Sequence, residues 1–236
     1  MSEPVRLDKC LAELIGCSRA QAQQYIEGGW VRVDGKVVEE PQAPIVAQRV
    51  ELAPDARAEP AEPATMLLHK PAGMPLNDSA RLVVPVNHTQ GDVSEVRLLK
   101  RHFQHLAPLM ALDADASGLV VLTQDPRVRR RLNEDYAQLE QEFVVEISGQ
   151  LAPYGLKKLA HGLSYRGRPL PPCKVSWQNE TRLRFAVKNV QPGQLRHVCG
   201  EVGLEVISTR RLRIGRIALS KMPVGEWRYL PVGERF

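Results

Sequence analysis

A short segment rich in proline, alanine and glutamate divides the chain into two unequal parts. Residues 53–64 read APDARAEPAEPA and offer almost nothing that a core could bury. Prolines keep such a segment extended, so it is typical of a semi-rigid linker. The sequence therefore predicts a small domain over residues 4–52 and a larger one over residues 65–231. A chain of 236 residues is long enough for each domain to bury a core.

The first part combines two helical patterns with a hairpin. Apolar residues recur at helical spacing over residues 7–15. Ser18 is a typical N-cap for a second helix over residues 19–27, which the two following glycines end. The alternation of VRVDGKVV around its Asp-Gly pair predicts a β-hairpin, and an apolar stretch at residues 45–52 closes the unit.

The second part alternates strands and helices. Apolar or alternating runs predict strands within residues 66–73, 118–123, 142–148, 182–190 and 206–215. Helices are predicted from Asp125-Pro126 onward and over residues 156–163 and 194–202. We therefore predict an α+β fold, in which a small helical and hairpin domain precedes a larger domain with a mixed, mostly antiparallel sheet.

Positive charge gathers in short stretches. The net charge is +5, and arginine and lysine cluster within residues 97–101, 127–131 and 210–216. Such clusters are typical of a phosphate-binding surface, although solvated helix faces show them too. There is no run of about 18 apolar residues and no apolar signal-peptide core, so we expect a cytoplasmic protein without membrane partners. The cysteines form no C-x-x-C pair, which favours reduced thiols.

Two aspartates precede the predicted strand at residues 118–123, in the segment LDADASGL. Asp113 and Asp115 fit the first half of a calcium loop, but Gln124 stands where that loop requires a glutamate, so calcium binding is rejected. A glycosidase-like carboxylate pair is one remaining possibility. The other is that both aspartates are turn residues before the strand.

The first part resembles the small S-four-like RNA-binding domain. The resemblance rests on RLDK at residues 6–9, the Ser18-Arg19 helix start, Ile26 with the following glycines, and the VRVDG hairpin at residues 31–35. It implies a structured RNA ligand, read mainly by shape and backbone. Positive side chains near helix starts gain nothing from the helix dipole, which favours phosphates as their partners. The side chains of this domain expected to bind RNA are Arg6, Lys9, Arg19, Arg32 and Lys36.

Four motifs of the second part resemble the RsuA-like family of ribosomal RNA pseudouridine synthases, which also carry an S-four-like domain in front. They are HKPAGM at residues 69–74, LDADASGLVVLTQD at residues 112–125, QLR at residues 194–196 with RIG at residues 213–215, and GEWR at residues 225–228. The resemblance implies isomerisation of uridine to pseudouridine in ribosomal RNA, with no metal or organic cofactor, and we expect a monomer. Lys70 and Gln194, which lie in these motifs, are further candidates for contact with RNA.

The resemblance also implies roles for three residues. Asp113 matches the aspartate that initiates cleavage of the uracil glycosidic bond, acting as a nucleophile or base on a nucleotide flipped out of its stack. Arg196 is the candidate for a basic partner that keeps Asp113 ionised in a dry pocket. Phe143 replaces the tyrosine of the family's K-x-Y motif and can still stack on uracil through its ring face.

The sequence departs from the family pattern at further positions. Ala111 replaces an arginine that helps fill the space of the flipped base, residues 189–193 replace a glycine-rich stretch, and His197 replaces a second arginine. Two hypotheses follow: an active but divergent synthase, or a non-catalytic RNA-binding protein that acts on ribosomal RNA or its assembly. The retained Asp113 in an intact LDADASGL segment favours the first hypothesis.

Overall fold

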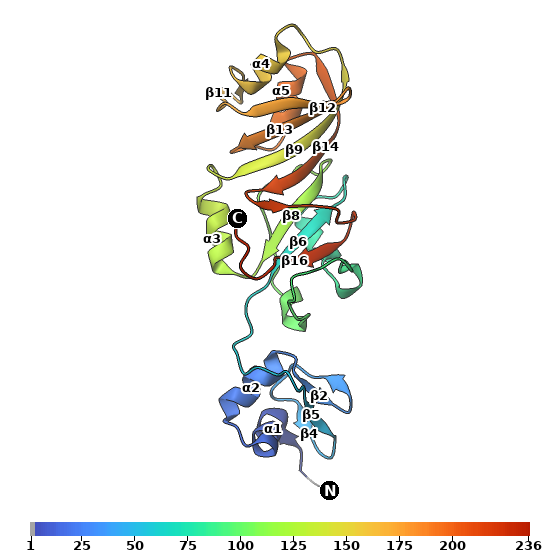
Figure 1. Cartoon of the computed structure of the whole chain (residues 1–236), viewed down its shortest axis with the longest axis vertical. Coiled ribbons are helices and arrows are strands. Elements are labelled where there is room, and N and C mark those ends of the chain that lie inside the picture. The colour runs from blue at the N-terminus through green and yellow to red at the C-terminus, as the bar shows by residue number, and fades with distance from the viewer. Residues whose placement is uncertain (1–2) are drawn as a thin grey trace. The chain divides into compact units, whose positions relative to one another are not determined.

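The computed structural model describes residues 3–236, which form two compact units (Figure 1). The first unit contains the chain up to Pro63 together with residues 97–104, and the second contains residues 64–96 and 105–236. The break after Pro63 falls within the proline-rich segment. The sequence did not predict that residues 97–104 belong to the first unit. Within the described residues, no helix has the length and apolar character needed to cross a membrane.

The first unit packs two helices against small sheets. Helix α1 spans Leu7–Ile15, and α2 spans Arg19–Glu27. The sheets pair β1 (Val5–Arg6) with β4 (Pro44–Ile45), and β2 (Val31–Val33) with both β3 (Lys36–Val37) and β5 (Val50–Leu52). The bounds of α2 are as predicted, because Ser18 and Gln21 form a reciprocal capping box at its start. The buried core consists of Leu7, Leu11, Ala22, Ile26, Val31 and Ile45.

Residues 97–104 pack on the first unit through one aromatic and several polar contacts. The guanidinium of Arg97 lies 3.6 Å from the centre of the Trp30 ring, and Arg97 Nη1 donates to the Gly29 carbonyl at 3.2 Å. Leu99 is buried beside Gly29, where an added Cβ would lie 2.8 Å from a Leu99 methyl group. The first unit is therefore built from two separate stretches of the chain.

The second unit is organised by one large sheet. Its main path runs β12-β13-β9-β14-β8-β6-β16, with β15 paired to β14 and β7 paired to β8. In chain order these strands are β6 (Thr65–Lys70), β7 (Pro108–Leu109), β8 (Ser117–Thr123), β9 (Glu140–Gly149), β12 (Lys174–Asn179), β13 (Arg182–Lys188), β14 (Leu204–Ile214), β15 (Ile217–Ala218) and β16 (Trp227–Tyr229). The pairing of β14 with β8 is parallel and the other pairings along the path are antiparallel, which confirms the predicted mixed sheet.

Helices and short turns surround this sheet. Helix α3 (Pro126–Glu134) packs against β7 and β8, α4 (Gly155–Ala160) against β12, and α5 (Gln194–Gly200) against β14 (Figure 1). A separate hairpin joins β10 (Ser164–Tyr165) to β11 (Arg168–Pro169) and contacts α5. Short 3₁₀ turns occupy η1 (Leu76–Leu82) and η2 (Pro85–Asn87), whereas a third, η3 (Lys100–Phe103), belongs to the first unit.

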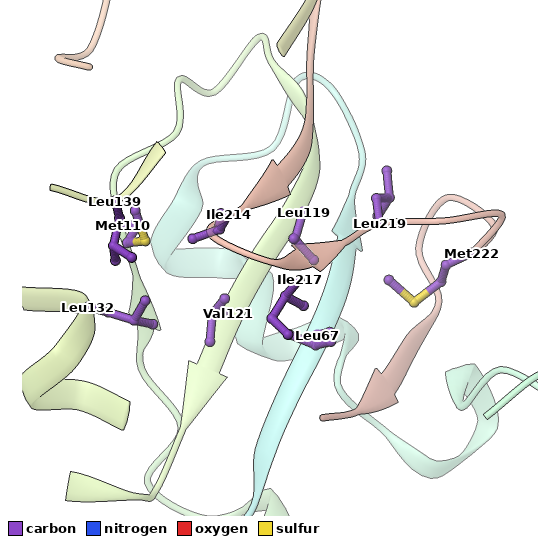
Figure 2. Close-up of a cluster of buried hydrophobic side chains, with 10 residues drawn as sticks. All are labelled: Leu67, Met110, Leu119, Val121, Leu132, Leu139, Ile214, Ile217, Leu219 and Met222. Carbon is purple, nitrogen blue, oxygen red and sulfur yellow. The ribbon is translucent and has the colours of Figure 1, made fainter. Parts of the chain in front are cut away.

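The middle of the sheet carries the main apolar core. Leu119 and Val121 of β8 point into a cluster with Leu67, Ile214 and Ile217 from neighbouring strands (Figure 2). Beside the core, β8 approaches β14 so closely at Gly118 that an added Cβ would lie 2.3 Å from the Arg211 carbonyl oxygen. A side chain has no room there. The predicted central strand is therefore confirmed. Its close contact with β14 at Gly118 fixes the point where the segment that carries the two aspartates enters the sheet.

Some local predictions differ from the structure. Helix α4 ends at Ala160 and α5 at Gly200, earlier than the apolar patterns indicated. Leu14 of α1 is exposed, since the core of this small unit covers only one side of the helix. The cysteines are free thiols within the described residues, and burial raises the pKa of Cys199 to about 12. At neutral pH this thiol is protonated.

Candidate active site

A cleft of about 430 Å³, open to solvent, lies in the second unit where the loop before β8 faces α5. Side chains from distant parts of the chain meet there. Strands β9 and β14 lie side by side at the cleft, and the loops that precede β8 and α5 complete its lining. The cleft brings together all three residues predicted to carry the chemistry. They are Asp113, Phe143 and Arg196.

Asp113 lies in a tight turn and directs its carboxylate to a backbone donor. The Ala116 N–H donates to the Asp113 carbonyl at 3.1 Å, which closes the turn before β8. The Gly193 N–H donates to Asp113 Oδ2 at 3.0 Å. Such a bond fixes the direction of the carboxylate, and a fixed direction is what a nucleophile or base requires. The prediction of a turn and the prediction of a functional carboxylate are therefore compatible.

A buried lysine fixes the backbone just after Asp113. Lys70 is fully buried, and its Nζ donates to the carbonyls of Pro71, Met74 and Ala114 at 2.9, 2.8 and 3.1 Å. The Gly73 N–H adds a bond of 2.8 Å to the Ala114 carbonyl. Burial lowers the pKa of Lys70 and Arg211 lowers it further, whereas Asp115 and Asp113 oppose the shift. The turn after β6 is thereby joined to the loop that carries the aspartates.

A buried arginine fixes the backbone just before Asp113. The Arg211 guanidinium donates to the Ala111 carbonyl at 2.9 Å, to the Met110 carbonyl at 3.2 Å and to the Leu119 carbonyl at 2.7 Å. Burial lowers its pKa to about 10, so the guanidinium stays charged at neutral pH. Lys70 and Arg211 thus hold the loop on both sides of Asp113, through carbonyl groups rather than carboxylates.

Phe143 forms part of the cleft wall. It lies on β9, opposite Arg211 of β14 and Phe185 of β13, and its side chain is almost fully buried. Its flanking strands therefore fix its place, and it shares the cleft with Asp113 as predicted. A planar base that entered beside Asp113 would meet this ring, and ring faces stack on any base.

The position of Arg196 corrects one expectation. Arg196 lines the cleft, but its ion pair is with Asp115, and its Nη1 donates to the Val206 carbonyl at 2.8 Å. Both partners of the pair are about half exposed. The expectation that Arg196 pairs with Asp113 is therefore wrong for this structure, because Asp115 holds the guanidinium. Asp113 and Asp115 have different partners, although only one residue separates them.

In the first unit, the predicted RNA-binding arginines share a buried carboxylate. Asp8 is fully buried and accepts hydrogen bonds from Arg6 at 2.9 Å, Arg19 at 3.1 Å and Gln23 at 2.9 Å. Burial acts to raise the pKa of Asp8, but the bonds from Gln23, Arg19 and Arg6 hold it well below its usual range. Two guanidinium groups with one carboxylate between them leave a net positive charge. Both arginine side chains stay about half exposed.

The remaining RNA-binding candidates divide into exposed and buried residues. Lys9, Arg32 and Lys36 are exposed on the first unit, as expected for phosphate contacts. Lys70 and Gln194 are buried, and the Gln194 Oε1 accepts from the Gln191 N–H at 3.0 Å. In this structure both polar groups bind the protein's own backbone, and contact of Lys70 and Gln194 with RNA stays a prediction.

The predicted basic clusters are largely engaged within the protein. On α3, Arg127 pairs with Asp125 at 3.0 Å and Arg130 with Glu134 at 2.7 Å. In the cluster at residues 210–216, Arg211 is buried and Arg213 pairs with Glu140 at 2.7 Å. These positions show that clustering along the sequence does not by itself give a free positive surface. Among residues 3–236, no group of three or more His, Cys, Asp or Glu side chains is arranged to hold a metal ion.

Comparison with known families agrees with this division of the chain. Residues 5–47 match the S4 domain, and residues 64–176 match the RNA pseudouridylate synthase family. The second match contains Asp113 and Phe143 and ends before Arg196. Over residues 64–176 the chain is therefore similar to the RNA pseudouridylate synthases. This match confirms the resemblance that the LDADASGL segment and the KPAG turn carried.

Known pseudouridylate synthases extend the likeness over nearly the whole chain. The dual-specificity RNA pseudouridine synthase RluF of Escherichia coli (strain K12) is 27% identical, covering 96% of this chain and 75% of that protein. Ribosomal large subunit pseudouridine synthase B of Bacillus subtilis (strain 168) is 26% identical, covering 95% of this chain and 91% of that protein. A pseudouridylate synthase crystal structure has a TM-score of 0.59, at 22% identity and 96% coverage of both chains, which shows a shared fold.

Several residues around Asp113 were not predicted from the sequence. The buried contacts of Lys70 and Arg211 gave no signal in the sequence, because each depends on carbonyl groups far away along the chain. Gly193 was also missed, although its backbone N–H is the donor to Asp113. A glycine just before a predicted helix was the only local sign of it.

Proposed function

We propose that this pseudouridylate synthase isomerises a specific uridine of structured ribosomal RNA to pseudouridine, with Asp113 initiating cleavage of the glycosidic bond. The observation that carries the proposal is the placement of the Asp113 carboxylate. It lies in an open cleft, on a loop held from both sides by buried cations, and it accepts the Gly193 N–H. A fixed carboxylate beside an aromatic ring suits attack on a nucleotide that has left its stack.

The residues around Asp113 have separate roles in binding the RNA. Phe143 offers a ring face on which the flipped uracil stacks, a role that requires no phenol hydroxyl. Arg196 is half exposed at the cleft and carries a guanidinium, which suits contact with an RNA phosphate near the target nucleotide. Ala111 leaves open the space that an arginine fills in the family pattern, so this chain must fill it with another group or with the RNA itself.

The S4 domain supplies sequence-independent affinity in this proposal. Arg6 and Arg19 are oriented by Asp8, and Lys9, Arg32 and Lys36 are exposed on the same unit. Lysine and arginine contacts with phosphates position an RNA without reading its sequence. The chain acts as a monomer on ribosomal RNA in the cytoplasm, and neither a metal ion nor an organic cofactor takes part.

The test maps pseudouridines in ribosomal RNA from cells that lack the gene. A site should be lost on deletion, return with the wild-type gene, and stay absent with Asp113→Asn. Asp78→Asn is the matched control: it removes the same charge from a 3₁₀ turn that does not line the cleft, and we expect it to restore the site. Loss of no pseudouridine on deletion would contradict the proposal.

A binding measurement separates chemistry from recognition. Asp113→Asn should bind an RNA fragment that contains the mapped site with an affinity within about twofold of the wild type, since the S4 domain is unchanged. If Asp113→Asn abolished RNA binding together with the pseudouridine, the carboxylate would be needed for binding rather than for bond cleavage.

A further inference from the structure

The loop at residues 189–193 forms one wall of the active-site cleft and carries the donor to Asp113. Val190, Gln191 and Pro192 line the cleft, and Gly193 follows directly. The backbone turns sharply at both ends of the loop, because Asn189 and Gly193 have positive φ angles of 51° and 76°. A loop of this kind has no regular backbone ladder to hold it, so the precision of the Gly193 N–H depends on its side-chain contacts.

Two tyrosine hydroxyl groups bind this loop. The Tyr165 hydroxyl donates to the Pro192 carbonyl at 2.7 Å, and the Tyr136 hydroxyl donates to the Val190 carbonyl. Tyr165 lies on β10, and Tyr136 lies just after α3. Pro192 is the residue directly before Gly193, and the peptide that joins them contains both the carbonyl bound by Tyr165 and the N–H donated to Asp113. One planar group thus connects Tyr165 with Asp113.

The Tyr165 ring is packed closely enough to hold this peptide in place. A Cβ added at Gly193 would lie 2.8 Å from the Tyr165 hydroxyl. The His197 ring lies 5.2 Å from the Tyr165 ring, and the Arg166 guanidinium lies 5.1 Å from its centre. The hairpin, the loop and the start of α5 therefore pack as one local assembly around the hydroxyl.

We propose that Tyr165 is a positioning residue for the isomerisation, acting through the Pro192–Gly193 peptide to hold a hydrogen-bond donor on the Asp113 carboxylate. The inference rests on the proposed role of Asp113 in the reaction. Tyr165 touches neither the base nor the reacting atoms in this role. Its hydroxyl fixes the plane of a peptide, and that peptide fixes the direction of the Asp113 carboxylate.

The main test compares Tyr165→Phe with the wild type. Loss of one hydrogen bond corresponds to about a threefold to tenfold change, so we expect kcat to fall by about that factor. KM for the RNA should change by less than about twofold, since Tyr165 acts on the loop rather than on the substrate. Tyr154→Phe is the matched control, because Tyr154 is an exposed tyrosine outside the cleft. It should leave both constants unchanged.

A second measurement follows the hydrogen bond between Gly193 and Asp113 directly, without relying on activity. Amide hydrogen exchange at Gly193 reports how often its N–H leaves Asp113. Tyr165→Phe should speed this exchange by about threefold to tenfold, while Tyr154→Phe should not alter it. Thermal unfolding of the variants shows whether the fold as a whole is retained.

Each outcome decides between specific alternatives. A lower kcat together with faster Gly193 exchange supports the proposal. An unchanged kcat, or a lower kcat with unchanged Gly193 exchange, overturns it; in the second case Tyr165 acts directly on the RNA. If the wild type forms no pseudouridine, the proposed function fails. The exchange measurement then decides the role of Tyr165 in the loop by itself.

Discussion

Lys70 and Arg211 show how a buried cation can position the Asp113 carboxylate without touching it. Each donates to backbone carbonyl groups of the loop around Asp113: Lys70 to that of Ala114, and Arg211 to those of Met110 and Ala111. A buried charge is tolerated only when its hydrogen-bonding capacity is satisfied, and the three carbonyls bound by Lys70 Nζ meet that requirement. The loop thereby gains a fixed shape, while the Asp113 carboxylate stays available to the cleft.

Replacing Lys70 tests this structural role against the predicted contact of Lys70 with RNA. Lys70→Met keeps a similar length but removes the ammonium donor from three carbonyls, of which only that of Ala114 keeps a second donor, the Gly73 N–H. We expect the second unit to lose at least about 2 kcal/mol of its free energy of unfolding, because unsatisfied buried acceptors are costly. RNA affinity should stay within about twofold. The measurement combines urea unfolding, followed by amide exchange in β6 and β8, with RNA binding.

Lys158→Met is the control for this prediction. Lys158 is exposed on α4, so the same chemical change should alter the free energy of unfolding by less than about 0.5 kcal/mol. A Lys70→Met variant that stayed stable but no longer bound RNA would instead restore Lys70 as an RNA-binding residue.

At the scale of elements, Asp8 joins the two helices of the S4 domain. It lies on α1, while Arg19 and Gln23, which donate to it, lie on α2. Its folded pKa is below the value of about 3.9 expected for an unfolded chain. The resulting stabilisation is complete above about pH 5 and is lost as pH falls through 4 toward the lower folded pKa.

Asp8→Asn should therefore destabilise the first unit in a pH-dependent manner. At pH 7 we expect a loss of about 1–3 kcal/mol, since a buried group with charged hydrogen bonds is altered. The difference between variant and wild type should shrink below about pH 4, where the carboxyl group of the unfolded wild-type chain becomes protonated while that of the folded chain is still ionised. Urea unfolding followed by Trp30 fluorescence measures both. Glu13→Gln, at an exposed position of α1, should show no such difference.

The elements that the sequence predicted well carry their signals locally. Helix α2 begins where Ser18 and Gln21 cap it, and β8 is an unbroken apolar run between turn residues. The intramolecular contacts of Lys70 and Arg196 could not be predicted in this way. Lys70 binds the distant Ala114 carbonyl and Arg196 is held by Asp115, and neither pairing follows from spacing along the chain. Asp113 could be found because its segment is specific, whereas its donor Gly193 lies in a loop that departs from the family pattern.

At the scale of the whole molecule, the net charge of +5 hides an uneven distribution of positive side chains. Many arginines of the second unit are used within the fold, such as Arg130 with Glu134 and Arg213 with Glu140. Lys9 and Lys36 of the first unit are exposed and belong to the domain type that binds RNA. Affinity for RNA phosphates should therefore depend on where a charge lies rather than on the total charge.

The salt dependence of RNA binding tests this distribution. Each phosphate that a lysine or arginine neutralises contributes about 0.7–0.9 to the slope of the logarithm of affinity against the logarithm of salt concentration. The double variant Lys9→Gln/Lys36→Gln should reduce the slope by about that amount for each phosphate that it no longer neutralises. Arg130→Gln removes a charge already paired with Glu134 and should leave the slope unchanged. Equal reductions per charge removed would mean that RNA responds to net charge alone, and the assignment of phosphate binding to the S4 domain would then be wrong.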